Sequence, residues 1–171
     1  MTDWDAYNNK TKDLLPHTLV VEALSYIQGT NRALDLGCGA MRDIPAIAGA
    51  GFKRIDAVDS NSSIQVIAQE YAKQGIPLTF YPVFYTEFDF GKDTYDFISA
   101  QYALPFSPPE AFDEMFARLV TSLKIGGVFT GQFFGKEDSW ADNPKMTFHT
   151  EREIRKLLEK FQIHIHNKEL N

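Results

Sequence analysis

The chain has 171 residues, of which 44% are hydrophobic and 23% charged, and this size suits a single domain built around one core. Its net charge of −6 and the absence of a Lys/Arg cluster argue against a protein that grips a nucleic-acid backbone, so we expect no nucleic-acid partner. No apolar run reaches the roughly 20 residues that cross a bilayer, no secretory signal is visible, and Cys38 is the only cysteine, which together predict a cytoplasmic protein without membrane contact.

Helices and strands are predicted to alternate from residue 14 onward. Apolar residues at every fourth position predict the first helix over 14–28, which Gly29 ends. A short apolar run that ends at a glycine turn predicts the first strand, over 32–36, as a buried one. Capping-box patterns at Ser107 and Thr150 predict the starts of two later helices. In chain order, the elements after the first strand are a helix over 41–49, a strand over 54–59, a helix over 64–74, strands over 78–83 and 95–100, a helix over 108–125, a strand over 128–134, a helix over 151–158 and a sixth strand over 161–166.

This alternation is typical of an α/β protein. Strands joined by helices of roughly 10–15 residues imply right-handed crossovers and a mostly parallel sheet with helices on both faces. We therefore predict a doubly wound, Rossmann-like sheet in a single domain spanning 1–171. Within it, residues 1–31 are expected to form a helical cap and residues 32–171 the core.

The turn after the first strand is the first candidate binding site. Doubly wound sheets bind ligands outside the carboxyl ends of their strands. Gly37 and Gly39 allow a tight turn and a close approach of the backbone to a ligand. Asp59 follows the second strand, twenty residues after Gly39, where a carboxylate can accept hydrogen bonds from both ribose hydroxyls of an adenosine group. The combination predicts a cofactor that contains a nucleoside.

Two such cofactors compete for this turn, a dinucleotide and S-adenosylmethionine. The dinucleotide fingerprint requires a third glycine at the position where this chain has Arg42. Asp35 places a carboxylate at the end of the first strand, which suits a ligand with an ammonium group better than a pyrophosphate. We therefore predict S-adenosylmethionine, and a nucleotide-dependent oxidoreductase is the less favoured alternative.

From about Ala33 to Phe161 the sequence resembles the class I S-adenosylmethionine-dependent methyltransferases, and within them the small bacterial tellurite-resistance group. Residues 33–39, Ala-Leu-Asp-Leu-Gly-Cys-Gly, closely match the first motif of that family, and Asp59 matches its acid after the second strand. Residues 95–98 resemble the fourth-strand motif, and 123–127 resemble the turn that leads into the fifth strand. The resemblance implies S-adenosylmethionine as the cofactor and the following residues as its binding site: Asp35, Gly37, Cys38, Gly39, Asp59, Ser60, Val83, Phe84, Gln101 and Tyr102.

The resemblance also implies a role for some of these residues. Gly37 and Gly39 would border the methionine part of the cofactor, and Asp59 would hold the ribose. Gln101 and Tyr102 would lie close to the sulfonium and to the methyl acceptor.

Three departures from the family pattern bear on the cofactor site and the sheet. Met41 stands where the family usually has a third glycine, so its side chain must point away from the pocket or press on the cofactor. No acid follows the third strand until Glu87, which leaves backbone groups near Val83 and Phe84 to meet the adenine. The family's last antiparallel strand is not accounted for, and we expect another subunit or other material to cover the edge of the fifth strand. These departures favour the alternative hypothesis, a weak or inactive relative that acts as a sensing or interaction module.

The acceptor is expected to be a small molecule, because about 30 residues before the first motif and no inserted domain leave little protein to recognise a macromolecule. Trp4, Tyr7 and the loop over 135–149 would cover that acceptor. No residue stands out as a general base, which favours a sulfur, nitrogen or metalloid acceptor, or an acid that is already ionised. We expect a monomer or a homodimer.

The remaining reactive side chains are interpreted as structural. Cys38 lies in the glycine turn, but transfer from a sulfonium needs no protein nucleophile. His164 and His166 share a strand face without a third ligand at convincing spacing, so we expect no metal site. His149 is the one histidine considered for a contact with the substrate.

Overall fold

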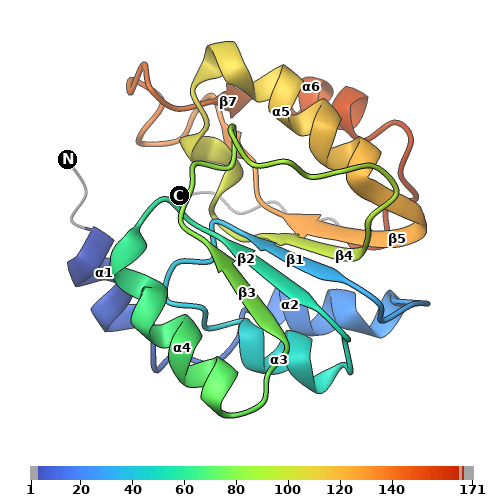
Figure 1. Cartoon of the computed structure of the whole chain (residues 1–171). Coiled ribbons are helices and arrows are strands. Elements are labelled where there is room, and N and C mark those ends of the chain that lie inside the picture. The colour runs from blue at the N-terminus through green and yellow to red at the C-terminus, as the bar shows by residue number, and fades with distance from the viewer. Residues whose placement is uncertain (1–3, 166, 168–171) are drawn as a thin grey trace.

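The centre of the molecule is a sheet of five parallel strands. The computed structural model describes residues 4–165 and 167. The strands lie in the order β3-β2-β1-β4-β5, and each neighbouring pair is parallel (Figure 1). This topology confirms the predicted doubly wound α/β class. The strand bounds are β1 (Ala33–Leu36), β2 (Ile55–Val58), β3 (Leu78–Tyr81), β4 (Tyr95–Ala100) and β5 (Leu123–Gly131).

Helices cover both faces of this sheet (Figure 1). On one face, Val20, Ile44 and Ala68 anchor three helices in a single apolar cluster. On the other face, Phe112 and Phe116 belong to a second cluster, against which the last helix also packs. The helices are α2 (Thr18–Ala23), α3 (Ile44–Gly49) and α4 (Gln65–Lys73) on the first face, and α5 (Pro109–Ser122) and α6 (Glu151–Leu157) on the second.

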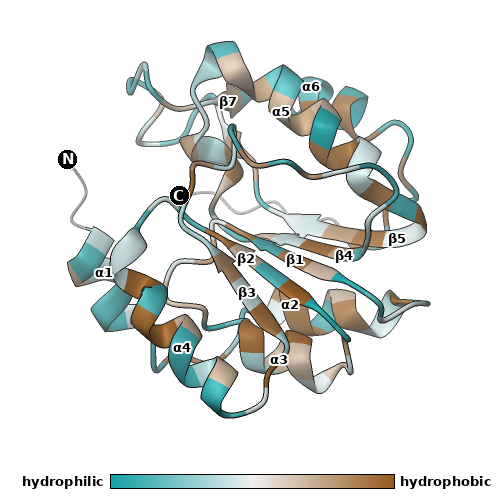
Figure 2. Cartoon of the chain, in the orientation of Figure 1, coloured by the Kyte–Doolittle hydropathy of each residue, from teal (hydrophilic) through white to brown (hydrophobic). Residues whose placement is uncertain are grey.

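The remaining elements are short and lie around the sheet. Figure 2 shows hydrophobic residues recurring along the central strands, while α1, α4 and α6 carry many hydrophilic residues. Figure 1 shows α1 beside the start of α4, away from the layered core. These elements are α1 (Trp4–Thr11), the 3-10 turns η1 (Leu24–Tyr26), η2 (Ser62–Ile64) and η3 (Leu104–Phe106), and the two-residue strands β6 (Phe134–Gly135) and β7 (Phe148–His149), which pair with each other.

The topology places a ligand crevice between β1 and β4. These two strands are neighbours in the sheet, yet the chain leaves β1 toward β2 over one face and leaves β4 toward β5 over the other. The loops after β1 and β4 therefore diverge, and a crevice opens at the carboxyl edge where they part. Of the predicted site residues, Asp35 lies in the last part of β1, and the others follow β1, β2, β3 and β4 at this edge.

Two predicted boundaries are wrong at the ends of helices. The first helix begins at Thr18 rather than near residue 14, because Pro16 restricts the residue before it, and Leu15 is 82% exposed. The helix α5 ends at Ser122, and β5 starts directly afterwards with Leu123 opposite Tyr95. A register shift follows, so the predicted glycine stop is a β-bulge inside the strand.

The predicted sixth strand is also wrong. Residues 161–165 form no strand, and His166 lies outside the described residues. The Phe161 ring packs on Phe129, and the His164 ring stacks on Tyr26 at a centroid distance of 4.4 Å. The alternating pattern reflects side-chain packing on the end of the domain instead of backbone pairing. Among the described residues, β4 is the only strand that pairs with β5.

Candidate functional site

The turn after β1 is made of glycines because two other segments press against it. Gly37 has φ +66°, and a Cβ there would lie 2.5 Å from the Ala103 Cβ in the loop after β4. Gly39 has φ +45°, and a Cβ there would lie 3.2 Å from the Asn8 Oδ1 of α1. Both positions combine a left-handed backbone with little room, so only glycine fits without adjustment.

Met41 has the left-handed backbone conformation that favours glycine, the residue that the family usually has at this position. Its φ is +59°, in the left-handed region, and its side chain is fully buried in the apolar cluster beneath α3. Burial among neighbours such as Ile44 directs the side chain into the core. Of the two arrangements expected from the sequence, the structure has the one in which Met41 points away from the crevice.

Asp59 ties the first two loops together. Its Oδ2 accepts a hydrogen bond from the Gly39 N–H (2.9 Å), and its Oδ1 accepts one from the Asn61 N–H (2.8 Å). A carboxylate has about four acceptor sites, so two remain for further donors such as ribose hydroxyls. The carboxylate is half-buried and held in place before any ligand arrives.

Asp35 is a buried carboxyl that has no basic partner among the described residues. Only 3% of it is exposed, and burial, followed by the charges of Asp43 and Asp59, raises its pKa well above the usual value. An ammonium group would relieve both the burial and the repulsion between carboxylates. A carboxyl group at this edge therefore fits the ammonium group at the amino-acid end of S-adenosylmethionine.

Cys38 is not activated as a nucleophile. The side chain is 7% exposed, and burial, followed by the charges of Asp35 and Asp59, raises the pKa of its thiol well above the ordinary value. The thiol stays protonated near neutral pH, in agreement with its interpretation as a small turn residue.

A chain of amide hydrogen bonds links the ends of β4 and β5. The Tyr102 N–H donates to the Gln132 Oε1 (2.7 Å), and the Gln132 Nε2 donates to the Gln101 Oε1 (2.7 Å). The Gln101 Nε2 donates in turn to the Thr130 Oγ1 (3.4 Å). Gln101 is thus buried and directed toward β5, whereas the ring of Tyr102 is 45% exposed. Tyr102 also has a φ of +51°, in the left-handed region. Strained backbone conformations of this kind are frequent at functional sites.

The loop after β3 offers an exposed ring in place of an acid. The Phe84 side chain is 58% exposed, and Ser60, after β2, is exposed as well. The Val83 N–H is already donated to the Tyr81 carbonyl (2.9 Å), so this amide is not free for an adenine. The Tyr85 hydroxyl donates to the Ala103 carbonyl (2.9 Å) and fixes the loop against β4.

The helix α1, part of the segment expected to form a helical cap, covers the first two loops through contacts that the sequence analysis did not predict. The Asp5 Oδ1 accepts hydrogen bonds from the Asn61 Nδ2 (2.8 Å) and the Ser63 Oγ (2.7 Å). These bonds lower the pKa of Asp5. Asn8 lies over Gly39 and is buried there. No local pattern signals these contacts, because the residues that they join are distant in the sequence, by 56 and 58 positions for the two hydrogen bonds of Asp5.

Aromatic side chains from four segments meet beside the loop after β4. Phe106 is the central ring, at centroid distances of 5.2 Å from Trp4 and 5.8 Å from Trp140. Two other rings, Phe134 and Tyr7, contact Phe106 and Trp4 respectively. Trp4, Tyr7 and Trp140 each keep more than 40% of their surface exposed. We call these five residues the aromatic wall.

A large groove, lined in part by Tyr102 and Phe134, follows the outer edge of β5. Its volume is about 1360 Å³, and its walls come from α2, β5, α6 and residues 160–165. One end of the groove is lined by His17, Tyr102 and Gln132, next to the carboxyl ends of β4 and β5. The crevice therefore opens into a space that a small molecule can enter.

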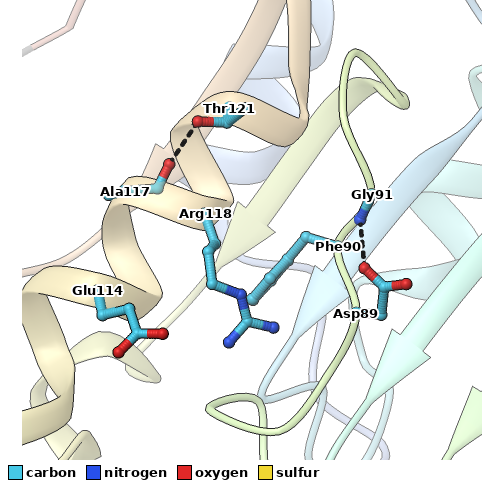
Figure 3. Close-up of a pocket in the computed structure, with 7 residues that line it drawn as sticks. All are labelled: Asp89, Phe90, Gly91, Glu114, Ala117, Arg118 and Thr121. Atoms are coloured by element: carbon cyan, nitrogen blue, oxygen red, sulfur yellow. Dashed lines mark hydrogen bonds between the residues drawn. The ribbon is translucent and has the colours of Figure 1, made fainter.

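A second hollow, of about 370 Å³, lies away from this edge (Figure 3). Arg118 of α5 donates to the carbonyl oxygens of Thr86 (2.9 Å) and Phe88, and its guanidinium lies over the Phe90 ring. These contacts of the guanidinium hold the loop before β4 against α5. We assign this hollow a structural role.

His149 packs among aromatic side chains on the α5 side of the sheet. His149 is 9% exposed, with its ring at centroid distances of 4.5 Å from Phe112 and 5.8 Å from Phe133, and burial lowers its pKa. Over residues 4–165 and 167, no three His, Cys, Asp or Glu side chains are grouped so that they could hold a metal ion. No helix in the same part of the chain is long and apolar enough to cross a membrane.

Comparisons with known proteins agree with this architecture. A family model described as a methyltransferase domain matches residues 33–127. No curated protein matches the sequence. TehB from Haemophilus influenzae is similar in structure, with 19% identity and a TM-score of 0.79, over 96% of this chain and 57% of that one. This chain therefore spans little more than half the length of TehB.

Two further solved structures resemble the chain at low identity. The putative methyltransferase from Haloferax volcanii, solved with its Trm112 activator, has 18% identity and a TM-score of 0.74 over 94% of this chain and 76% of that one. The 1,6-didemethyltoxoflavin-N1-methyltransferase from Burkholderia thailandensis, solved with 1,6-didemethyltoxoflavin and S-adenosylhomocysteine, has 23% identity and a TM-score of 0.65 over 92% of this chain and 71% of that one. At these identities the likeness concerns the fold.

Proposed function

Because the chain belongs to the methyltransferase domain family and its cofactor is S-adenosylmethionine, we propose that it transfers a methyl group to a small acceptor held against the aromatic wall. The observation that carries this proposal is the carboxyl edge of the sheet. There the Gly39 turn, the fixed carboxylate of Asp59 and the buried carboxyl of Asp35, which has no basic partner among the described residues, lie at the same edge of the sheet as Tyr102, which lines the groove.

Each part of the cofactor has a matching group in the proposed site. Asp35 receives the ammonium group, and the glycine turn with Cys38 borders the methionine chain. Asp59 and Ser60 face the ribose. Val83 and the exposed ring of Phe84 pack on the adenine, with aromatic stacking taking the place of an acid. Gln101 acts indirectly in this arrangement, because its amide holds Gln132 and through it the Tyr102 backbone.

The aromatic wall supports an acceptor with a flat apolar part. Half-exposed Trp and Tyr rings gathered in one patch are typical of a binding surface, because buried packing would cover more of them. The groove, with a volume of about 1360 Å³, is large enough to admit a small acceptor, since ligand pockets commonly have volumes of about 300–1,000 Å³. One similar structure holds the small molecule 1,6-didemethyltoxoflavin, which is a property of that protein.

The main role of the chain's own residues is to align the acceptor with the methyl group of the cofactor. S-adenosylmethionine brings a methyl group that its positive sulfur already activates. Asp35 and Asp59 fix the two ends of the cofactor, while the strained Tyr102 backbone and the aromatic wall orient the acceptor and exclude water. The interactions that matter are therefore those that hold two small molecules in line.

Two measurements test the proposal. Calorimetric titration with S-adenosylmethionine and S-adenosylhomocysteine measures cofactor binding. Transfer of a radiolabelled methyl group to a panel of phenols, thiols and aromatic amines measures turnover. We expect binding of both compounds and transfer to at least one acceptor. Binding without transfer, or no binding at all, would favour the alternative role as a sensing or interaction module and would contradict methyl transfer.

A further inference from the structure

His17 is held by a buried carboxylate although the two residues are 26 positions apart. The His17 backbone N–H donates to the Asp43 Oδ1 (2.7 Å), and the Nδ1 of its ring lies 2.7 Å from the Asp43 Oδ2. Asp43 is 3% exposed and lies four residues after Gly39, at the start of α3. Two bonds to one carboxylate fix both the position and the plane of the imidazole ring.

This contact leaves the far nitrogen of the ring available. A carboxylate only accepts hydrogen bonds, so Nδ1 carries the proton, and the neutral ring then has a lone pair on Nε2. Within residues 4–165 and 167, no hydrogen bond engages Nε2, and the His17 side chain keeps 20% of its surface exposed. The ring is held as a proton acceptor directed away from Asp43.

The ring also lies where the acceptor is expected. Its centroid is 5.6 Å from that of Tyr102, the exposed residue with a strained backbone at the end of β4. Together with Gln132, these two side chains line the inner end of the groove. Arg42 approaches from the same side, but its guanidinium is bound to the Leu15 carbonyl. Among the described residues that line this end, His17 thus packs on Tyr102 and has a ring nitrogen, Nε2, without a hydrogen bond.

We infer that His17 is the general base of the reaction and that the acceptor carries its proton at neutral pH, as the hydroxyl of a small phenol does. This inference rests on the proposed methyl transfer. As the acceptor oxygen bonds to the methyl carbon, the carbon–sulfur bond breaks and its electron pair stays on sulfur. The hydroxyl proton moves to the His17 Nε2, and the Asp43 carboxylate stabilises the resulting imidazolium. The base that sequence analysis did not find comes from the segment before α2.

A purely structural role predicts different behaviour. If Asp43 served only to anchor the N-terminal segment, the protonation state of the ring would not matter to turnover. His17→Gln keeps the backbone N–H and a polar side chain that can reach Asp43, but it removes the basic nitrogen. His164→Gln is the matched control, because His164 lines the same groove but is exposed and stacks on Tyr26, with no carboxylate bonded to its ring in the described part of the chain.

The first test is the tautomer of His17, which needs no acceptor. Nitrogen-15 NMR of the histidine rings, with S-adenosylhomocysteine bound, is assigned by comparison with His17→Gln. We expect the Nδ1–H tautomer for His17 in the wild type near neutral pH, and loss of this preference in Asp43→Asn. An Nε2–H tautomer or a permanently charged ring would overturn the inference.

The second test compares two acceptors that differ in their need for a base. Phenol keeps its proton at mildly alkaline pH, whereas 4-nitrophenol is largely ionised there. We expect His17→Gln to lose at least about 100-fold in rate with phenol, the usual contribution of general-base catalysis. With 4-nitrophenol the loss is small, and S-adenosylhomocysteine affinity is unchanged.

The outcomes separate the inference from the proposed function. Equal rates for His17→Gln and the His164→Gln control with phenol would overturn the role of His17 while leaving methyl transfer intact. A wild type that binds the cofactor but turns over neither phenol contradicts the proposed transfer to such acceptors. That outcome overturns the base assignment as well, whereas transfer to a thiol or an amine of the panel would leave the proposed methyl transfer intact.

Discussion

The two halves of the crevice are built in different ways. The proposed cofactor half is built mainly from the loops after β1 and β2, between Asp35 and Asn61. Its contacts are backbone geometry at Gly37 and Gly39 and the bonds of one carboxylate. The proposed acceptor half comprises His17, Tyr102, Gln132 and the aromatic wall, which come from separate segments of the chain.

This difference explains what each half can tolerate. The cofactor half depends on backbone angles and on contacts under 3 Å, so a single methyl group can disrupt it. The acceptor half depends on side chains that are partly exposed and individually replaceable. A family can therefore keep one cofactor site and change its acceptors by altering distant segments.

The largest expected effect comes from Gly37→Ala in the cofactor half. The new Cβ would lie 2.5 Å from the Ala103 Cβ, at a residue with φ +66°. Left-handed strain of about 1–2 kcal/mol and overpacking of about 1–3 kcal/mol together lower the free energy of unfolding by about 3 kcal/mol. Urea unfolding measures the loss.

The matched control for this substitution is Gly75→Ala. Gly75 has φ +81° but nothing within 4 Å of its Cβ position, so only the strain of about 1–2 kcal/mol applies. Equal losses for the two variants would show that Ala103 does not press on the turn.

Asp35→Asn tests the electrostatic part of the cofactor half. Replacing the carboxylate leaves an ammonium group without its charged partner, worth about 1.5–3 kcal/mol, or about 10- to 100-fold in S-adenosylhomocysteine affinity. Burial raises the pKa of Asp35, so protonation sets in at a higher pH than for an ordinary carboxyl and removes the charge that attracts the ligand. Wild-type affinity, measured by calorimetry, should therefore fall as the pH is lowered below neutrality.

The same pH series checks the origin of that fall. The Asp35→Asn variant has no charge to lose at this position, so its affinity should depend less on pH than that of the wild type. An equally steep pH dependence in both proteins would assign the effect to another group.

Phe106→Ala tests the independence of the acceptor half. The two tryptophans of the chain, Trp4 and Trp140, both contact this ring, so their fluorescence reports on the aromatic wall alone. We expect a red shift of the emission without loss of S-adenosylhomocysteine affinity. Phe161→Ala is the control, since Phe161 packs on Phe129 and contacts no tryptophan in the described structure. Loss of cofactor binding in Phe106→Ala would show that the two halves are coupled.

The smallest expected effect is the difference between two variants at Met41. Both Met41→Ala and Met41→Gly lose a buried side chain, at a cost of about 2–5 kcal/mol. Glycine also relieves the strain of the left-handed backbone at φ +59°, so the glycine variant should be the more stable by about 1 kcal/mol. Thermal unfolding of the pair measures the difference, and a more stable alanine variant would contradict the strained geometry.

The sequence predicted the cofactor half better than the acceptor half for a physical reason. Gly39 and Asp59 belong to a motif in which strand ends and spacing determine the contact, and the structure joins them directly. The first four strands were placed within about two residues of their bounds, because apolar runs and turns are local signals. Which of the predicted residues bind the cofactor stays a prediction.

The acceptor half and the chain ends depend on long-range packing. The contact of His17 with Asp43 and the cover that α1 gives to Gly39 have no signature in spacing or composition. Gln101 was expected near the sulfonium, yet its amide is directed toward Thr130. The predicted strand over 161–166 failed because alternation of apolar residues cannot distinguish strand pairing from packing against a surface.

The central claim is that Asp59 and the glycine turn form the cofactor site of this methyltransferase. Calorimetric titration of S-adenosylhomocysteine into the wild type, Asp59→Ala and Asp113→Ala tests it most directly, since Asp113 is an exposed aspartate on α5. We expect the wild type and Asp113→Ala to bind alike and Asp59→Ala to lose at least about 10-fold in affinity, as removal of hydrogen bonds to a charged group does. Unchanged affinity in Asp59→Ala, with its fold intact by circular dichroism, would contradict the account.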